Sequence, residues 1–188
     1  MRTVALVSGY GSTLEYFDDN GFAIACVIGD RSCRAFKVAE KAGILALWLP
    51  RGHAYDFNRD RYTEMLLRLL EEQKIDFVLM MGFMTPLGPA MFTKYRNRVL
   101  NSHPSLLPAF PGQHAIRDTL AAKPRPKKSG CSIILADEGS DTGKVIAQAE
   151  VPVSPVDVPA TLRARIQSVE KPLYLKKALE EIEKLRRS

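Results

Sequence analysis

The sequence of 188 residues predicts a doubly wound α/β fold with a mostly parallel sheet and an antiparallel strand pair near the C-terminus. Its apolar runs are short and continuous rather than alternating, which is typical of strands buried on both faces of a sheet. Helical patterns separate these runs, as the crossovers of a parallel sheet require. Beyond residue 130, two strand patterns are joined by the short turn "EGSDTG". A chain of this length fits one domain, 1–188.

In the first half, each apolar run is followed by a helical pattern. The run "TVALVS" precedes a glycine turn and a short helix, and "DRYTEMLLRLLEEQK" is strongly amphipathic. These patterns predict buried strands over 3–8, 22–29, 44–50 and 76–83, and helices over 12–19, 33–43 and 60–74.

In the second half, a short helix is expected near 88–95 and a fifth strand over 98–101. The antiparallel strands are expected over 131–137 and 144–153. A final helix covers roughly 157–186, and we expect Pro172 to interrupt it because proline breaks the helical hydrogen-bond ladder.

The formal net charge of +6 raises the question of a polyanionic partner. Much of the excess lies in "KPRPKK" (123–128) and in the tail "KLRRS", which we expect to be solvated. Aromatic residues do not interleave with the basic ones, so we expect no nucleic-acid partner. A mild positive field suits small anionic ligands.

No secretory signal or long apolar segment is visible, which predicts a cytoplasmic protein without a membrane partner. The three cysteines give neither a disulfide framework nor a paired metal knuckle. His53, His103 and His114 lack the spacing of a zinc-hydrolase motif, so we expect no metal.

The stretch "VSGYGSTLE" (7–15) reads as a strand, a glycine turn and a helix start. Free amides at such a helix N-terminus can bind a phosphate. Position 14 is Leu, so the third glycine of the dinucleotide fingerprint is missing. The alternative is a tight turn in which Ser12 caps the helix.

Polar residues in "NSHPSLLP" (101–108) point to a reaction site. Parallel strands gather ligands at their carboxyl ends, which brings this loop beside 9–13 and 82–87. His103 is a natural proton carrier, and Asn101 could stabilise an oxyanion. Asp141 is the best candidate to hold the imidazole, with Asp137 and Glu138 as rivals. A loop histidine and a turn-forming asparagine remain open alternatives.

No G-x-S-x-G nucleophile motif is present, so the set suits direct attack by a substrate amine through a tetrahedral intermediate. "HPSLLP" followed by "PG", together with the downstream D-x-G turn, resembles the folate-dependent formyltransferases over nearly the whole chain. The resemblance implies formyl transfer from 10-formyltetrahydrofolate to the amine of glycinamide ribonucleotide in purine biosynthesis, without a metal. It also implies a nucleotide-binding half, 1–100, and a catalytic and folate half, 101–188.

By the same resemblance, Asn101, His103 and Asp141 correspond to the catalytic residues. The substrate-binding positions are Gly11, Ser12, Thr13, Gln167 and Glu170. The folate-binding positions are Arg59, Met84, Thr85, Pro86, Leu87 and Asn101.

Several residues depart from the family's pattern: Thr13 replaces an amide, Thr85 and Pro86 replace an arginine and an aliphatic residue, and Ile134 replaces a histidine. They bear on substrate selectivity. Other readings are a different amine acceptor, hydrolysis of 10-formyltetrahydrofolate, or a noncatalytic nucleotide- or folate-binding module. The partners expected are small molecules, with a monomer or homodimer as the assembly.

Overall fold

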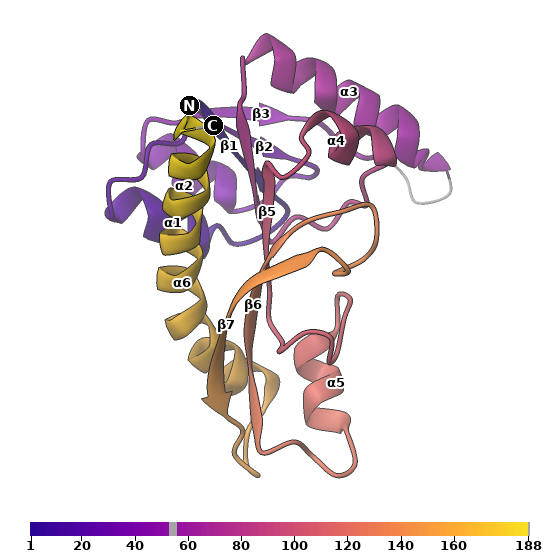
Figure 1. Ribbon diagram of the computed structural model, residues 1–188, viewed down its shortest axis with the longest axis vertical. Coiled ribbons are helices and arrows are strands. Elements are labelled where there is room, and N and C mark those ends of the chain that lie inside the picture. Colours follow the sequence, from indigo (N-terminus) through magenta and orange to yellow (C-terminus); the bar gives the residue numbers. More distant parts are fainter. Residues whose placement is uncertain (53–55, 188) are drawn as a thin grey trace.

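The computed structural model describes residues 1–52 and 56–187, so His53 lies outside the described residues. A single seven-stranded sheet has the strand order β3-β2-β1-β4-β5-β6-β7 (Figure 1). Its parallel part comprises β1 (Thr3–Val7), β2 (Cys26–Gly29), β3 (Leu45–Trp48), β4 (Phe77–Met81) and β5 (Val99–His103). The antiparallel strands β6 (Lys128–Leu135) and β7 (Lys144–Pro152) follow, which confirms the predicted fold class.

Helices cover both faces of the sheet (Figure 1). They are α1 (Ser12–Asp19), α2 (Ala35–Lys41), α3 (Arg59–Glu72), α4 (Pro89–Lys94), α5 (Ala115–Ala121) and α6 (Pro159–Arg187). One core cluster packs Leu100 of β5 against Phe17 of α1 and Tyr174 of α6. The other packs Val99 against Leu66 of α3 and Met91 of α4. Successive residues of β5 therefore face opposite layers.

The helix α6 is continuous through Pro172, so the predicted interruption is wrong. Proline supplies no N–H to the carbonyl of Ser168, but burial of the helix compensates for the lost bond. Tyr174 is fully buried, and its hydroxyl donates to the backbone carbonyls of Leu100 (2.8 Å) and Met80 (3.2 Å). These contacts hold α6 against β4 and β5.

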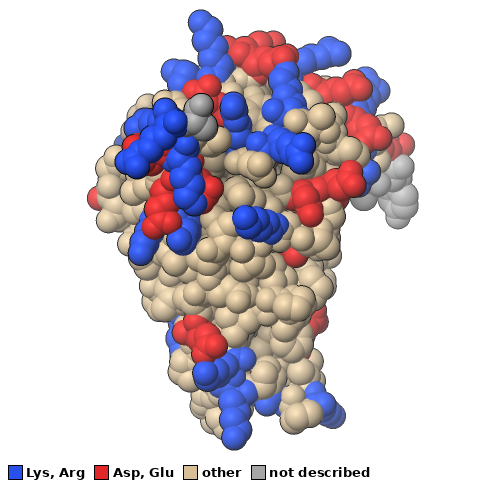
Figure 2. Space-filling view, in the orientation of Figure 1, with Lys and Arg blue, Asp and Glu red and all other residues tan. Residues whose placement is uncertain are grey.

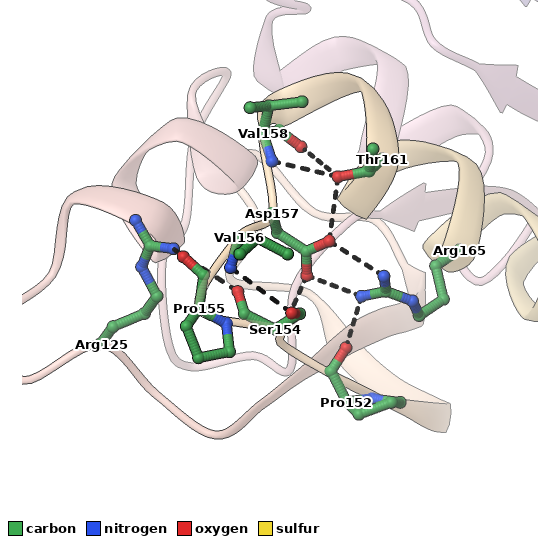
Figure 3. A network of polar contacts seen from close by, with 9 residues as sticks. All are labelled: Arg125, Pro152, Ser154, Pro155, Val156, Asp157, Val158, Thr161 and Arg165. Atoms are coloured by element: carbon green, nitrogen blue, oxygen red, sulfur yellow. Dashed lines mark hydrogen bonds and ion pairs between the residues drawn. The ribbon is translucent and has the colours of Figure 1, made fainter.

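A polar network anchors the start of α6 (Figure 3). The Asp157 carboxylate accepts hydrogen bonds from both terminal nitrogens of Arg165 (2.7 and 2.9 Å) and from the Thr161 hydroxyl (2.9 Å). Arg125 donates to the nearby carbonyl of Pro155 at 2.9 Å. Arg125 is exposed, as expected of 123–128, and its guanidinium also ties this segment to the start of α6 through a backbone carbonyl.

The strand β3 forms one edge of the sheet and is more exposed than its apolar sequence predicts. Trp48 is 63% exposed and Leu45 is 50% exposed. The prediction assumed that a continuous apolar run is covered on both faces, which is wrong for this edge strand. Exposed edge strands are places where another chain can pair.

Charges of both signs mix at the two ends of the face in Figure 2, with a largely uncharged band between them. Among the described helices, none combines the length and the apolar character needed to cross a membrane.

Candidate active site

Strand β5 carries two of the predicted catalytic residues within the strand itself. The sequence predicted that the strand ends at 101, but it continues to His103. Because side chains alternate along a strand, Asn101 and His103 share one face and Ser102 lies on the other. Asn101 pairs with Ile134 of β6, and no described residue hydrogen-bonds its side-chain amide.

His103 is buried and has protein partners at both ring nitrogens. Its Nδ1 lies 3.2 Å from Oδ2 of Asp141, and its Nε2 lies 2.8 Å from the carbonyl oxygen of Phe110. The same Asp141 oxygen accepts the backbone N–H of Gly112 at 2.8 Å. The structure therefore brings Asn101, His103 and Asp141 together around one end of β5.

The ion pair shifts the pKa of both partners toward their charged forms. Burial alone would lower the pKa of His103, but hydrogen bonds to Asp141 and the Phe110 carbonyl outweigh it, and the pKa is raised. Burial would raise the pKa of Asp141, but hydrogen bonds from His103 and Gly112 hold it below its usual range. A charged imidazolium donating two N–H groups satisfies both acceptors.

The turn between β6 and β7 determines which of its acids reaches the histidine. Asp137 accepts the Thr142 hydroxyl (2.7 Å) and the Gly139 N–H (3.1 Å), so it stabilises the turn. Glu138 is exposed. Asp141 has a φ of 58°, in the left-handed region that aspartate tolerates better than most residues. Of the three candidate acids, only Asp141 contacts His103.

The loop after His103 is tied down by two residues that sequence reasoning missed. Ser132 of β6 donates to the Ser105 carbonyl (2.7 Å) and accepts the Leu107 N–H (2.9 Å). Gln148 of β7 donates to the Leu107 carbonyl at 2.9 Å. The sequence sign that could have identified them is one polar residue within each of the two strand patterns, on the side that faces the loop. These bonds hold the chain that carries Phe110 against the imidazole.

The glycine turn before α1 leaves its helix N-terminus without a side-chain cap. Gly11 is the N-cap with a φ of 79°, and a Cβ there would come within 2.7 Å of the Ala35 Cα. The alternative in which Ser12 caps the helix is therefore wrong. Among the described residues, the backbone N–H groups of Ser12 and Thr13 have no partner. Unpaired N–H groups at a helix N-terminus suit an anion.

The predicted folate loop, from Gly82 to Gly88, forms neither helix nor strand, with Phe83, Thr85 and Leu87 buried and Met84 exposed. The Met84 N–H donates to the Ser8 hydroxyl at 2.8 Å, and Pro86 has no N–H. Among the described residues, the N–H groups of Thr85 and Leu87 have no partner.

The helix start of α3, with the predicted Arg59, adjoins the end of this loop. Thr63 accepts the Gly88 N–H (2.7 Å) and donates to the Arg59 carbonyl (2.8 Å). The Arg59 side chain is about half exposed, with its Nε 3.7 Å from Asp60.

The two predicted residues of α6 lie across the sheet from His103. Glu170 is buried, and burial raises its pKa even though the nearby Ser102 hydroxyl lowers it. Gln167 lines a surface cavity of about 350 Å³ between α1 and α6, together with Tyr16 and Lys171. Glu170 therefore lies on the opposite face of β5 from the His103 side chain. Within 1–52 and 56–187 there is no group of three His, Cys, Asp or Glu residues able to hold a metal ion.

A model of the formyl transferase family matches residues 1–178. The chain belongs to this family. A phosphoribosylglycinamide formyltransferase of Mycobacterium tuberculosis is 36% identical over 179 residues, spanning 93% of this chain and 81% of the relative. Its Escherichia coli counterpart is 34% identical, spanning 93% of this chain and 84% of the relative.

Solved structures agree with these sequence matches. The glycinamide ribonucleotide transformylase 1 of Symbiobacterium toebii superposes with a TM-score of 0.87 at 34% identity, covering 95% of this chain and 85% of that structure. The chain is therefore a formyltransferase, which confirms the predicted family and enzyme class.

Proposed function

We propose that this formyltransferase moves the formyl group of 10-formyltetrahydrofolate to the primary amine of phosphoribosylglycinamide, a step of purine biosynthesis. The observation that carries the proposal is the buried His103–Asp141 pair beside the unpartnered amide of Asn101. Relatives named phosphoribosylglycinamide formyltransferase support the acceptor. The human trifunctional purine biosynthetic protein supports the pathway. It is 33% identical over 92% of this chain, and the match spans only 17% of its own length.

In the proposed reaction the amine nitrogen attacks the formyl carbon, and the carbonyl oxygen becomes negative in a tetrahedral intermediate. The Asn101 amide N–H and the His103 imidazolium stabilise this oxyanion. The amine then loses a proton, and the folate nitrogen leaves carrying a proton. The products are the N-formyl nucleotide and tetrahydrofolate.

Both nitrogens of His103 already have protein partners. The imidazolium therefore acts first as a fixed positive charge beside the developing oxyanion. Proton transfer to or from the ring requires one contact to be exchanged for the substrate, and the neutral carbonyl of Phe110 is the weaker of the two acceptors. Asp141 keeps the ring oriented during this exchange.

The substrates fit the polar groups that the protein leaves unpaired. The phosphate is bound by the N–H groups of Ser12 and Thr13 beyond Gly11, and Gln167 and Glu170 hold the rest of the nucleotide. The folate is bound along 82–87, where Thr85 and Leu87 offer N–H groups, Met84 and Pro86 contribute surface, and Arg59 offers a cation. These positions cross the expected division into a nucleotide half, 1–100, and a catalytic and folate half, 101–188, because Arg59 and 82–87 lie in the first half and Gln167 and Glu170 in the second.

The proposal is tested in a single-turnover assay with 10-formyltetrahydrofolate and phosphoribosylglycinamide, with water alone and tRNA as control acceptors. We expect tetrahydrofolate release with the nucleotide only. His103→Ala and Asp141→Ala each reduce turnover by on the order of 10²-fold or more, because a positioned acid–base group is lost.

His114→Ala is the matched control, since His114 is exposed at the start of α5 and its side chain caps nothing. It should retain wild-type turnover. Wild-type kcat in both active-site variants would refute the mechanism, release with water alone would favour a hydrolase, and no release with any acceptor would favour a binding module.

A further inference from the structure

Outside the His103 site, one buried carboxylate collects donors from several strand ends. Asp30 follows β2 and is 3% exposed. Its Oδ2 accepts the Thr85 hydroxyl at 2.6 Å and Nη2 of Arg31 at 2.8 Å, while Oδ1 accepts Nε of Arg31 at 3.0 Å. Thr85 itself is 2% exposed and belongs to the loop after β4.

A second connection reaches the same carboxylate through Ser8, at the end of β1. The Ser8 hydroxyl accepts the Met84 N–H at 2.8 Å, and Ser8 is among the groups that lower the pKa of Asp30. Of two consecutive residues of the 82–87 loop, Thr85 is therefore bonded to Asp30 directly and Met84 is bonded to Ser8 beside it. The carboxyl ends of β1, β2 and β4 are joined at this point.

Stability alone does not explain this arrangement. Removing a carboxylate from water is costly, and a buried ion pair seldom stabilises a fold more than apolar packing would. What the bonds do fix is the backbone of a loop with no regular secondary structure. Among the described residues, that loop keeps the N–H groups of Thr85 and Leu87 unpaired although both residues are buried. Buried N–H groups without partners are rare unless a ligand pairs with them.

The geometry points to Asp30 as a positioning residue for the 82–87 loop, which it holds in the conformation that presents the free N–H groups to the formyl donor. The inference rests on the proposed function, because the donor is the ligand of this loop. The Thr85 side chain is then a link to Asp30 and not itself a ligand, while Arg31 keeps the acid charged and oriented.

The first test separates donor binding from chemistry. Thr85→Val keeps the shape of the side chain and removes the donated hydrogen bond, whereas Thr85→Ser keeps the hydroxyl. We expect Thr85→Val and Asp30→Asn to raise KM for the formyl donor by roughly tenfold, as expected for loss of a hydrogen bond to a charged group. KM for the amine and kcat at saturating donor should stay within about threefold of wild type. Thr85→Ser should restore KM for the donor to within about threefold of wild type.

Thr119→Val is the matched control, because Thr119 is buried in α5 and donates its hydroxyl to the Ala115 carbonyl at 2.8 Å. It should lower thermal stability without changing KM for the donor. If Thr85→Val behaves as Thr119→Val does, the network is only structural and the inference is wrong.

Amide hydrogen exchange gives a readout that does not depend on turnover. Faster exchange confined to 82–88 in Thr85→Val and Asp30→Asn supports loop positioning by Asp30, and unchanged exchange there overturns it. If the wild-type enzyme releases no tetrahydrofolate with phosphoribosylglycinamide, the proposed function fails, and the exchange result still decides whether Asp30 positions the loop.

Discussion

The ion pair of His103 and Asp141 links folding to the protonation of both residues. The imidazole pKa is raised above its ordinary 6.5, so this residue's contribution to stability is complete below that pH and is lost as pH rises through the folded value. The carboxyl pKa is lowered from 3.8, so its contribution is present above that pH and is lost as pH falls. The pair contributes most between these two ordinary values.

We therefore predict that Asp141→Asn destabilises the protein more at about pH 5.5 than at about pH 8.5. Urea unfolding of wild type and variant at both pH values measures the difference. Asp137→Asn is the control, because Asp137 stabilises the same turn without touching His103. Equal destabilisation by Asp141→Asn at both pH values would contradict the link.

At the residue scale, the sequence could predict Asn101 and His103 because they follow an apolar run in a short polar cluster. It favoured Asp141 as the acid but could not exclude Asp137 or Glu138 on geometry. That choice depends on which acid bonds its own turn and which one lies against His103 from a left-handed backbone. Asp30 was missed because its partners are 22 and 55 residues away in the chain, apart from its neighbour Arg31.

At the scale of elements, α6 allows a measurement of how much a proline lowers the free energy of unfolding when it lies inside a packed helix. Pro172 is exposed and lies in the middle of the helix, so Pro172→Ala should restore an N–H to the Ser168 carbonyl. We predict that it stabilises the protein by roughly 1 to 3 kcal/mol in denaturant unfolding.

Pro159→Ala serves as the comparison, because Pro159 is the first residue of α6, where a missing N–H is tolerated. Its effect should stay within about 0.5 kcal/mol. If Pro172→Ala proved neutral or destabilising, the helix would have to adapt to proline in a way that the burial of α6 does not explain.

Element boundaries were the least predictable part of the fold. Periodicity placed each strand and helix, but β2 begins at Cys26 rather than at 22, and β5 runs on to His103. In the second case, pairing with β6 extends the strand, since Ser102 and His103 lie opposite Ile133 and Ser132. Such long-range pairing overrides the local signal of Pro104, three residues beyond the predicted end.

For the whole molecule, the exposed edge at β3 gives a direct spectroscopic test. Trp48 is the only tryptophan of the chain, so its fluorescence reports on this edge alone. We predict a red-shifted emission that acrylamide quenches readily and that does not change with protein concentration. A blue shift on raising the concentration would show that a second copy covers β3 and would contradict the exposed edge.

The arrangement of strands and helices was more predictable from the sequence than the solvent exposure of the individual strands. Continuous apolar runs separated by helices predicted the parallel sheet, and the turn "EGSDTG" predicted the antiparallel pair. The same runs could not reveal which strand lies at the edge, because strand order depends on crossovers far apart in the sequence. The exposure of β3 follows from that order.

The left-handed backbone at Asp141 also narrows the substitutions that descendants of this sequence can accept. Glycine would suit the φ angle but would remove the acid, and glutamate would keep an acid on a longer chain with a poorer backbone preference. Asparagine would preserve the shape and lose the charge. We therefore expect glutamate, the other acidic residue, to impair the contact with His103 at this position.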